Sequence, residues 1–180
     1  MGQKFSEINQ THVHFIAQQQ MFFVATAAAD GRVNLSPKGL DSLRILGANQ
    51  VAWLSVTGSG NETAAHLLEN PRMTIMFCAF QGKPLILRLY GTARAVYERD
   101  ADWQEYARRF DLIAGVRQIF VMDVDLVQTS CGMAVPLFEY QGQRNQLVGW
   151  AEAKGKTGIA QYWRDKNQLS IDQKPTGIFE

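Results

Sequence analysis

This chain of 180 residues has only two cysteines, no excess of charge of one sign and no long apolar run. The 18 Lys and Arg residues nearly balance the 17 Asp and Glu residues, which leaves a formal net charge of +1, and no run of basic residues occurs. Nucleic-acid binding usually requires a surplus of cations that displaces the counterions of the phosphates, so we expect no nucleic-acid partner. No segment approaches the roughly 18 apolar residues that span a bilayer, so we expect no membrane span.

Cysteine and histidine are too few and too scattered to predict a metal site. The thiols are Cys78 and Cys131, and the imidazoles are His12, His14 and His66. No G-x-S-x-G motif supports hydrolase chemistry. The first ten residues have no basic segment followed by an apolar one, so we expect no signal peptide, a cytoplasmic protein and reduced thiols. These patterns assign no catalytic residue.

The spacing of apolar residues predicts a mainly β (α+β) fold, with a single domain over residues 1–180. About six strands joined by short turns favour an antiparallel split barrel of Greek-key type with small flanking helices. The expected strands cover residues 21–27, 32–36, 50–56, 72–80, 85–97 and 117–129, with a short extended piece at 43–46. The expected helices cover residues 7–20, 62–69, 98–110, 143–153 and 158–167, and the last two form a helical C-terminal extension from about residue 142.

Three local signals from glycine, proline and aspartate sharpen this prediction. Asp30-Gly31 lies between two extended segments and indicates a hairpin, because both residues tolerate positive φ. Pro37 is expected to end the pairing of the second arm, since proline lacks an amide donor. Gly91 inside a long strand indicates a bend or bulge.

The loop from Thr57 to Thr63 is the most informative candidate site. Its small residues allow close backbone approach to a ligand, and the helix that follows presents free amides that attract an anion. Ser59, Asn61 and Thr63 add side-chain donors for phosphate oxygens. The alternative is a capping box formed by Ser59 and Glu62, in which both side chains only satisfy the first amides of the helix.

Other candidates lie outside this loop. Ser36 and Lys38 follow an alternating strand, where the lysine either reaches an anion or is an ordinary surface residue. Arg88 lies in an apolar strand and either reaches a ligand or pairs with an acid such as Asp123 or Asp125. Ser130 and Cys131 close the last long strand. Cys131 has no neighbour in sequence that would lower its pKa, which favours a packing role over a redox role.

Several segments together resemble the flavin-binding split-barrel family that includes the pyridoxamine 5'-phosphate oxidases. These are FFVATAAADGRVNLSPKG, VAWLSVTGSGNETAAHLLENPRMTIMF, LILRLYGTARAVY and VQTSCGMAVPLFEY, the last followed by KNQLSID. The resemblance covers about residues 15–172 and is closer to an uncharacterised subgroup than to the vitamin B6 enzymes.

The resemblance implies a homodimer that holds FMN in clefts between its subunits. Lys38 matches a family lysine near the flavin, and Ser59, Asn61 and Thr63 occupy the phosphate-loop region. Ser130 and Cys131 match a region where the partner chain approaches the flavin.

The chain also departs from the family pattern. Glu62-Thr63 replaces an Arg-Lys pair in the phosphate loop, Ile86 replaces a glutamine near the flavin, and the C-terminal Arg-x-His motif of the B6 oxidases is absent. B6 oxidation is therefore not expected, and FMN phosphate binding needs other cations, for which Lys38 and Arg88 are the candidates.

The leading hypothesis is an FMN-dependent oxidoreductase acting on a small molecule. The alternatives are a flavin- or haem-binding module without turnover, and a split barrel that uses a deazaflavin or no cofactor.

Overall fold

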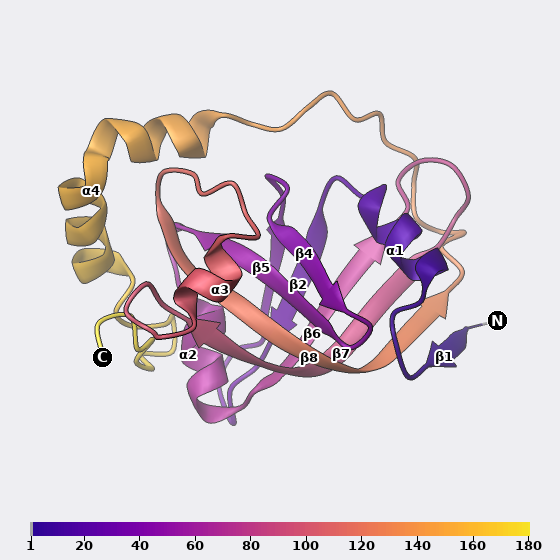
Figure 1. The fold of residues 1–180 in the computed structure, drawn as a ribbon, viewed down its shortest axis with the longest axis horizontal. Coiled ribbons are helices and arrows are strands. Elements are labelled where there is room, and N and C mark those ends of the chain that lie inside the picture. The colour runs from indigo at the N-terminus through magenta and orange to yellow at the C-terminus, as the bar shows by residue number, and fades with distance from the viewer. Residues whose placement is uncertain (1) are drawn as a thin grey trace.

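The computed structural model describes residues 2–180 and shows one antiparallel sheet with helices around it (Figure 1). The strands are β1 (Gln3–Phe5), β2 (Phe22–Thr26), β3 (Asn34–Lys38), β4 (Leu43–Gly47), β5 (Gln50–Val56), β6 (Arg72–Cys78), β7 (Ile86–Val96) and β8 (Val116–Ser130). The helices are α1 (Gln10–Ala17), α2 (Glu62–Glu69), α3 (Trp103–Ala107) and α4 (Gln146–Lys166). Within residues 2–180, no helix is both long and apolar enough to cross a membrane.

The sheet has eight strands rather than the expected six, in the order β3-β2-β6-β7-β8-β5-β4, with β1 paired to β8. The prediction missed β1, which has only three residues and no alternating pattern of its own. It treated β4 only as an extended piece, although β4 forms a hairpin with β5. The mainly β, antiparallel class is confirmed.

β8 organises the sheet because its 15 residues pair with three different strands. β7 shares the longest ladder with it, and the register of that ladder shifts between Tyr90 and Gly91. A Cβ at Gly91 would collide with the carbonyl oxygen of Asp123, so a side chain cannot fit there. The expected bulge at this glycine is confirmed.

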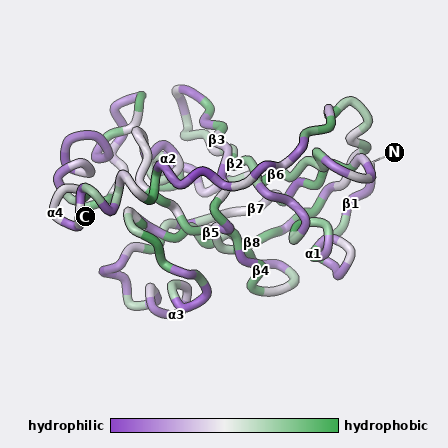
Figure 2. Tube along the Cα trace, turned by 90° about the horizontal axis from the view of Figure 1, so that it is seen from above, coloured by the Kyte–Doolittle hydropathy of each residue, from purple (hydrophilic) through white to green (hydrophobic). Residues whose placement is uncertain are grey.

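The core lies along the central strands, where the hydrophobic residues concentrate (Figure 2). The stacked rings of Trp53 on β5 and Phe120 on β8 lie 4.5 Å apart at its centre. A second apolar cluster packs α3 against β5 and β8 through Trp103, Ile119 and Val121. Both faces of β8 are therefore covered over this stretch.

Three local expectations need correction. The hairpin expected around Asp30-Gly31 is confirmed, but its second arm begins at Asn34 rather than at residue 32, since pairing of β2 with β3 starts at Thr26 and Asn34. Pro37 does not end β3, since β3 is an edge strand and tolerates a missing amide. The helix expected at 98–110 is short, because Asp100 accepts from the amide of Tyr97 in a turn that delays α3.

The C-terminal extension forms a bent helix followed by a segment that returns to the sheet. α4 includes both helices expected at 143–153 and 158–167, divided at Gly155, which has φ 63°. The segment after α4 is anchored by Lys174, whose ammonium contacts Asp30 at 2.6 Å and Glu69 at 2.7 Å. Tyr97 adds a hydrogen bond from its hydroxyl to the carbonyl of Thr176. This segment therefore lies beside α2 and the β2–β3 loop.

Candidate functional site

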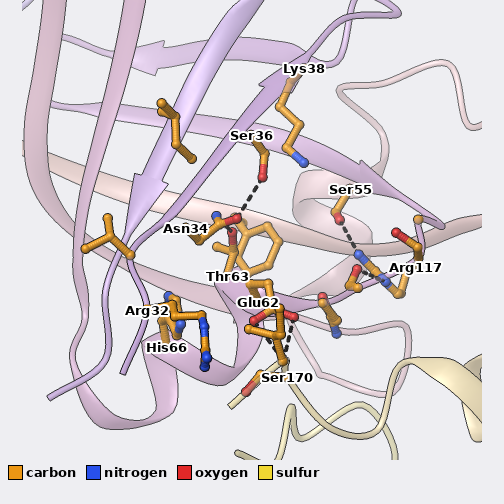
Figure 3. Close-up of a pocket in the computed structure, with 18 of the residues that line it drawn as sticks. Arg32, Asn34, Ser36, Lys38, Ser55, Glu62, Thr63, His66, Arg117 and Ser170 are labelled. Carbon is orange, nitrogen blue, oxygen red and sulfur yellow. Dashed lines mark hydrogen bonds between the residues drawn. The ribbon is translucent and has the colours of Figure 1, made fainter. Parts of the chain in front are cut away.

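A cavity of about 730 Å³ lies where the N-terminal end of α2 meets β3, β5 and β8 (Figure 3). Further parts of its wall come from Lys166, Leu169, Ser170 and Ile171, at the end of α4 and just after it, and from residues 32–33 before β3. Its volume is within the range of about 300–1,000 Å³ that is typical of small-molecule sites. Five of the eight predicted site residues line it: Ser36, Lys38, Ser59, Asn61 and Thr63.

β3 contributes a polar row through alternate residues. Asn34, Ser36 and Lys38 share one face because successive side chains of a strand point to opposite sides. Ser36 donates to Asn34 Oδ1 at 2.9 Å, and the Asn34 amide donates to Thr63 Oγ1 at 3.3 Å. These bonds connect the edge strand to the first turn of α2.

The loop from Thr57 to Asn61 does not form the capping box considered from the sequence. Asn61, not Ser59, is the N-cap of α2, and its side chain makes no capping hydrogen bond. Glu62 instead accepts the backbone amide of Ile171 with both carboxylate oxygens, each at 3.1 Å. The carboxylate is thus engaged by the C-terminal segment, and the first amides of α2 receive no side-chain cap.

Lys38 and Arg117 extend toward the same part of the cavity from β3 and β8 (Figure 3). Burial, and secondarily the charge of Arg117, lowers the pKa of Lys38 to about 8. Burial also lowers the pKa of Arg117 to about 10, so both groups are cationic at neutral pH. Neither side chain forms an ion pair with an acid among residues 2–180. Lys38 Nζ lies 5.2 Å from the centre of the Trp53 ring, a weaker form of compensation.

The sequence reasoning missed Arg117 because a β-bulge positions it. Ser55 pairs with Gln118 and Val56 pairs with Val116, so Arg117 is the extra residue on β8. Simple alternation would place Arg117 on the face of Ile119 and Val121, whereas the bulge turns it to the cavity that Phe120 lines. The available signal was Arg117 itself, the only basic residue of this strand, just before the apolar run at residues 119–122.

Unsatisfied polar atoms gather at this cavity. Among residues 2–180, five buried side-chain atoms lack a hydrogen-bond partner: Trp53 Nε1, Asn61 Nδ2, His66 Nε2, Arg117 Nε and Gln118 Oε1. All but the last belong to residues that line the cavity. The indole, amide and guanidinium nitrogens can only donate. A cavity wall with this excess of unpaired donors has a positive local potential, which suits a ligand rich in acceptor oxygens.

The other three predicted residues lie outside this cavity. Arg88 donates to Ser130 Oγ at 3.1 Å, across the β7–β8 ladder. The alternative considered from the sequence, an ion pair of Arg88 with Asp123 or Asp125, does not form, because Arg88 pairs in register with Gln128. Cys131 is exposed just beyond β8, whereas Cys78 is buried as expected, and burial raises its pKa.

A second cavity, of about 910 Å³, lies between α1, the β6–β7 turn and residues 138–140. Its wall is mainly apolar and includes Phe15, Phe80 and Phe138. Phe80 and Phe138 pack edge to face with ring centres 5.4 Å apart. None of the unsatisfied buried atoms named above belongs to its lining residues.

Comparisons with known proteins agree with the resemblance noted from the sequence. The family model described as pyridoxamine 5'-phosphate oxidase matches residues 8–131. The pyridoxamine 5'-phosphate oxidase family protein ustO of Aspergillus flavus is 41% identical over 127 residues, which are 68% of this chain and 51% of that protein. The chain thus spans about half the length of this curated relative.

Solved structures share the fold at low sequence identity. HupZ of Group A Streptococcus matches with a TM-score of 0.55 and 22% identity, over 68% of this chain and 99% of that chain. A pyridoxamine 5'-phosphate oxidase-related, FMN-binding protein of Nostoc punctiforme matches with a TM-score of 0.53 and 12% identity, over 71% and 85%. The family model covers well over half of the residues. The chain therefore belongs to the pyridoxamine 5'-phosphate oxidase family.

Proposed function

We propose that this protein is an FMN-binding oxidoreductase that acts on a small molecule and binds the cofactor's phosphate at the cavity of Lys38 and Arg117. The observation that carries the proposal is the set of buried donors without partners on residues lining this cavity, together with two cations that no acid neutralises. Leaving such groups unpaired is unfavourable, so a bound anion stabilises the protein.

The residues present fit a flavin phosphate even though the family's Arg-Lys pair is replaced. Ser59 and the uncapped amides of α2 face the cavity, and helix N-termini favour anions. Glu62 would oppose a phosphate, but Ile171 holds its carboxylate. Arg117, rather than Arg88, supplies the second cation within the chain.

Bound FMN would supply hydride or electron transfer, and the protein's part is to bind, orient and shield it. Lys38, Arg117 and the α2 loop hold the anionic end. Thr63 accepts from Asn34 and so keeps its own hydroxyl proton to donate to the polar chain of the ligand. Ser36, whose proton goes to Asn34, can accept from that chain. Val33 and Leu35 alternate with the polar row of β3 and lie at the exposed rim of the cavity.

We also propose that the sheet closes as a split barrel and that two copies form a homodimer with the flavin between them. The rim residues Val33 and Leu35 are 73% and 63% exposed, which is unusual for large apolar side chains near a site. A second copy would cover them. Arg88, Ser130 and Cys131, which do not line their own chain's cavity, would then approach the partner's flavin.

The test is a visible absorbance spectrum of the purified protein before and after incubation with FMN and desalting. A retained flavin spectrum, followed by bleaching with NAD(P)H and recovery in air, supports the oxidoreductase. A retained flavin that no donor reduces indicates a binding module without turnover. A colourless protein that fails to retain FMN contradicts the proposal, and light scattering that shows a monomer at micromolar concentration contradicts the shared site.

A further inference from the structure

The C-terminal extension contributes to the cavity although it lies beyond the residues that the family model matches. That match ends at residue 131, whereas Lys166, Leu169, Ser170 and Ile171 all line the cavity. Asn167, between them, is fully buried at 0% exposure. A polar side chain buried to this degree is normally held by specific hydrogen bonds.

Asn167 connects Arg117 to the glycine loop. Its Oδ1 accepts from Arg117 Nη1 at 2.8 Å, and its Nδ2 donates to the carbonyl of Gly58 at 3.1 Å. Its own carbonyl accepts from Thr176 Oγ1 at 2.6 Å, which fixes its backbone. The side chain thus has one orientation, and that orientation determines where the guanidinium lies.

The bonds of Arg117 leave one edge of its guanidinium free. Both hydrogens of Nη1 are used, by Asn167 Oδ1 and by the Gly60 carbonyl at 3.0 Å. Nη2 makes one bond, to Ser55 Oγ at 3.4 Å, and Nε makes none. Nε and Nη2 lie on the same edge. Nε is buried and closed to solvent, so this edge offers the cavity its uncompensated positive charge rather than a two-point contact.

The partners of Arg117 are also all uncharged. An aspartate in place of Asn167 would form an ion pair with Arg117 and cancel the charge that a ligand must find. The amide instead positions the cation and leaves its charge available. A phosphate monoester carries between one and two negative charges at neutral pH, so it can neutralise both Arg117 and Lys38, whereas a carboxylate neutralises only one.

We infer that Asn167 is a positioning residue that holds the uncompensated charge of Arg117 at the cavity and makes the site select a phosphate monoester over the same ligand without its phosphate. This inference rests on the proposed function and extends it, since it assigns selectivity to a segment outside the family match. Because the phosphate is the recognised group, inorganic phosphate alone should also bind at this site.

The experiment compares the dissociation constants of FMN and riboflavin, measured by flavin fluorescence, for the wild type, Asn167→Asp and Asn145→Asp. Riboflavin has the same ring without the phosphate. Asn145 lies exposed at the start of α4 in the same extension, so it is a matched control for the added charge. We expect Asn167→Asp to weaken FMN about 30-fold and riboflavin less than about twofold, because the new carboxylate competes with the phosphate for Arg117. Asn145→Asp should change neither.

A second variant covers the case in which Asn167→Asp does not fold. Asn167→Ser retains a small polar side chain that is too short to reach Arg117, and it should reduce the preference for FMN over riboflavin about fivefold. An unchanged preference in a folded variant, checked by near-ultraviolet circular dichroism, overturns the inference while the flavin proposal stands. If the wild type binds neither flavin, the proposed function fails. In that case inorganic phosphate should raise the melting temperature of the wild type but not that of Asn167→Ser. Equal increases in the two melting temperatures would overturn the inference.

Discussion

The cavity at the start of α2 measures about 730 Å³, and the cavity beside α1 measures about 910 Å³. The larger one is mainly apolar, and the charged residues at its edge, Lys83 and Glu139, are exposed. The smaller one contains the half-buried Lys38 and the buried Arg117, neither of which has an acid partner among residues 2–180. Volume and apolar character alone would select the larger cavity.

The difference between the two cavities is one of energetic cost. An apolar wall left beside water requires no specific partner, because exposed apolar surface is common in folded proteins. A buried cation or unpaired donor destabilises the fold by about 1–3 kcal/mol for each group, so it persists only where function or a ligand compensates. Unsatisfied polar groups therefore indicate the ligand site better than apolar volume does.

The largest expected effect follows from Arg117→Met. Losing the charge-assisted contact of the phosphate with this cation, about 3 kcal/mol, should weaken FMN binding about 100-fold. The fold should survive, because methionine removes a buried charge whose desolvation is unfavourable. The measurement is a fluorescence titration of FMN, with circular dichroism to check folding.

Arg72→Met is the matched control for this prediction, since Arg72 is exposed on β6 and bonds only to Asn70. It should leave FMN binding unchanged. If the FMN dissociation constant of Arg117→Met lies within threefold of the wild-type value, the unpaired cation is not part of the ligand site. Unsatisfied polar groups would then not identify the ligand cavity.

The second prediction concerns pH and Lys38. The pKa of Lys38 in the folded protein is about 8, below its ordinary value of 10.5, so the unfolded state binds this proton more tightly. The contribution of Lys38 to the free energy of unfolding therefore rises with pH between about 8 and 10.5. FMN binding should change in the opposite direction and weaken roughly tenfold from pH 7 to pH 9, because the cation is lost while the phosphate stays a dianion.

Lys38→Met separates these effects from other titrations. The variant should bind FMN about tenfold more weakly at pH 7 and lose the decline toward pH 9. Riboflavin binding should show no such decline in either protein. If the wild type and Lys38→Met have parallel pH profiles for FMN, Lys38 does not contact the anionic end.

Local sequence patterns predicted the elements that carry the site. The strand at residues 50–56 and the helix at 62–69 have the bounds expected, because alternation and the Asn70-Pro71 stop act within a few residues. The bulge at Gly91 was also predictable, since a glycine inside a long strand weakens the ladder and often marks a bulge or a close backbone approach. Five of eight site candidates line the cavity for the same local reasons.

Arg117 and Asn167 were not predictable in this way. The role of Arg117 depends on a register shift between β5 and β8, which are far apart in the chain. Asn167 contacts Arg117 across 50 positions and Gly58 across 109. Ser59 and Glu62 fitted a capping box, but the competing partner of Glu62, Ile171, arrives from the far end of the sequence. In all three cases, contacts between residues far apart in the sequence determine the position of the side chain.

The third prediction has a smaller effect and the opposite sign. Glu62→Gln removes the negative charge at the phosphate loop but keeps an acceptor for the amide of Ile171. FMN should bind about two- to fivefold more tightly, because a repulsion weakened by water is relieved. Riboflavin should not respond. Glu105→Gln on α3 is the control, and equal FMN affinities for both variants would exclude an effect of Glu62 on the anion.

The smallest expected effect on FMN comes from the apolar cavity. Phe80→Ala removes the edge-to-face contact with Phe138 and part of the cavity wall. Urea unfolding should show a loss of about 1 kcal/mol or somewhat more, since aromatic pairs contribute about 0.5–1.5 kcal/mol beyond buried area. The dissociation constant of FMN should stay within twofold, because no phosphate-binding group touches this wall. A loss of FMN affinity as large as that of Lys38→Met would mean that the two cavities act on one ligand, which in a homodimer requires the apolar wall of one subunit to reach the flavin of the other.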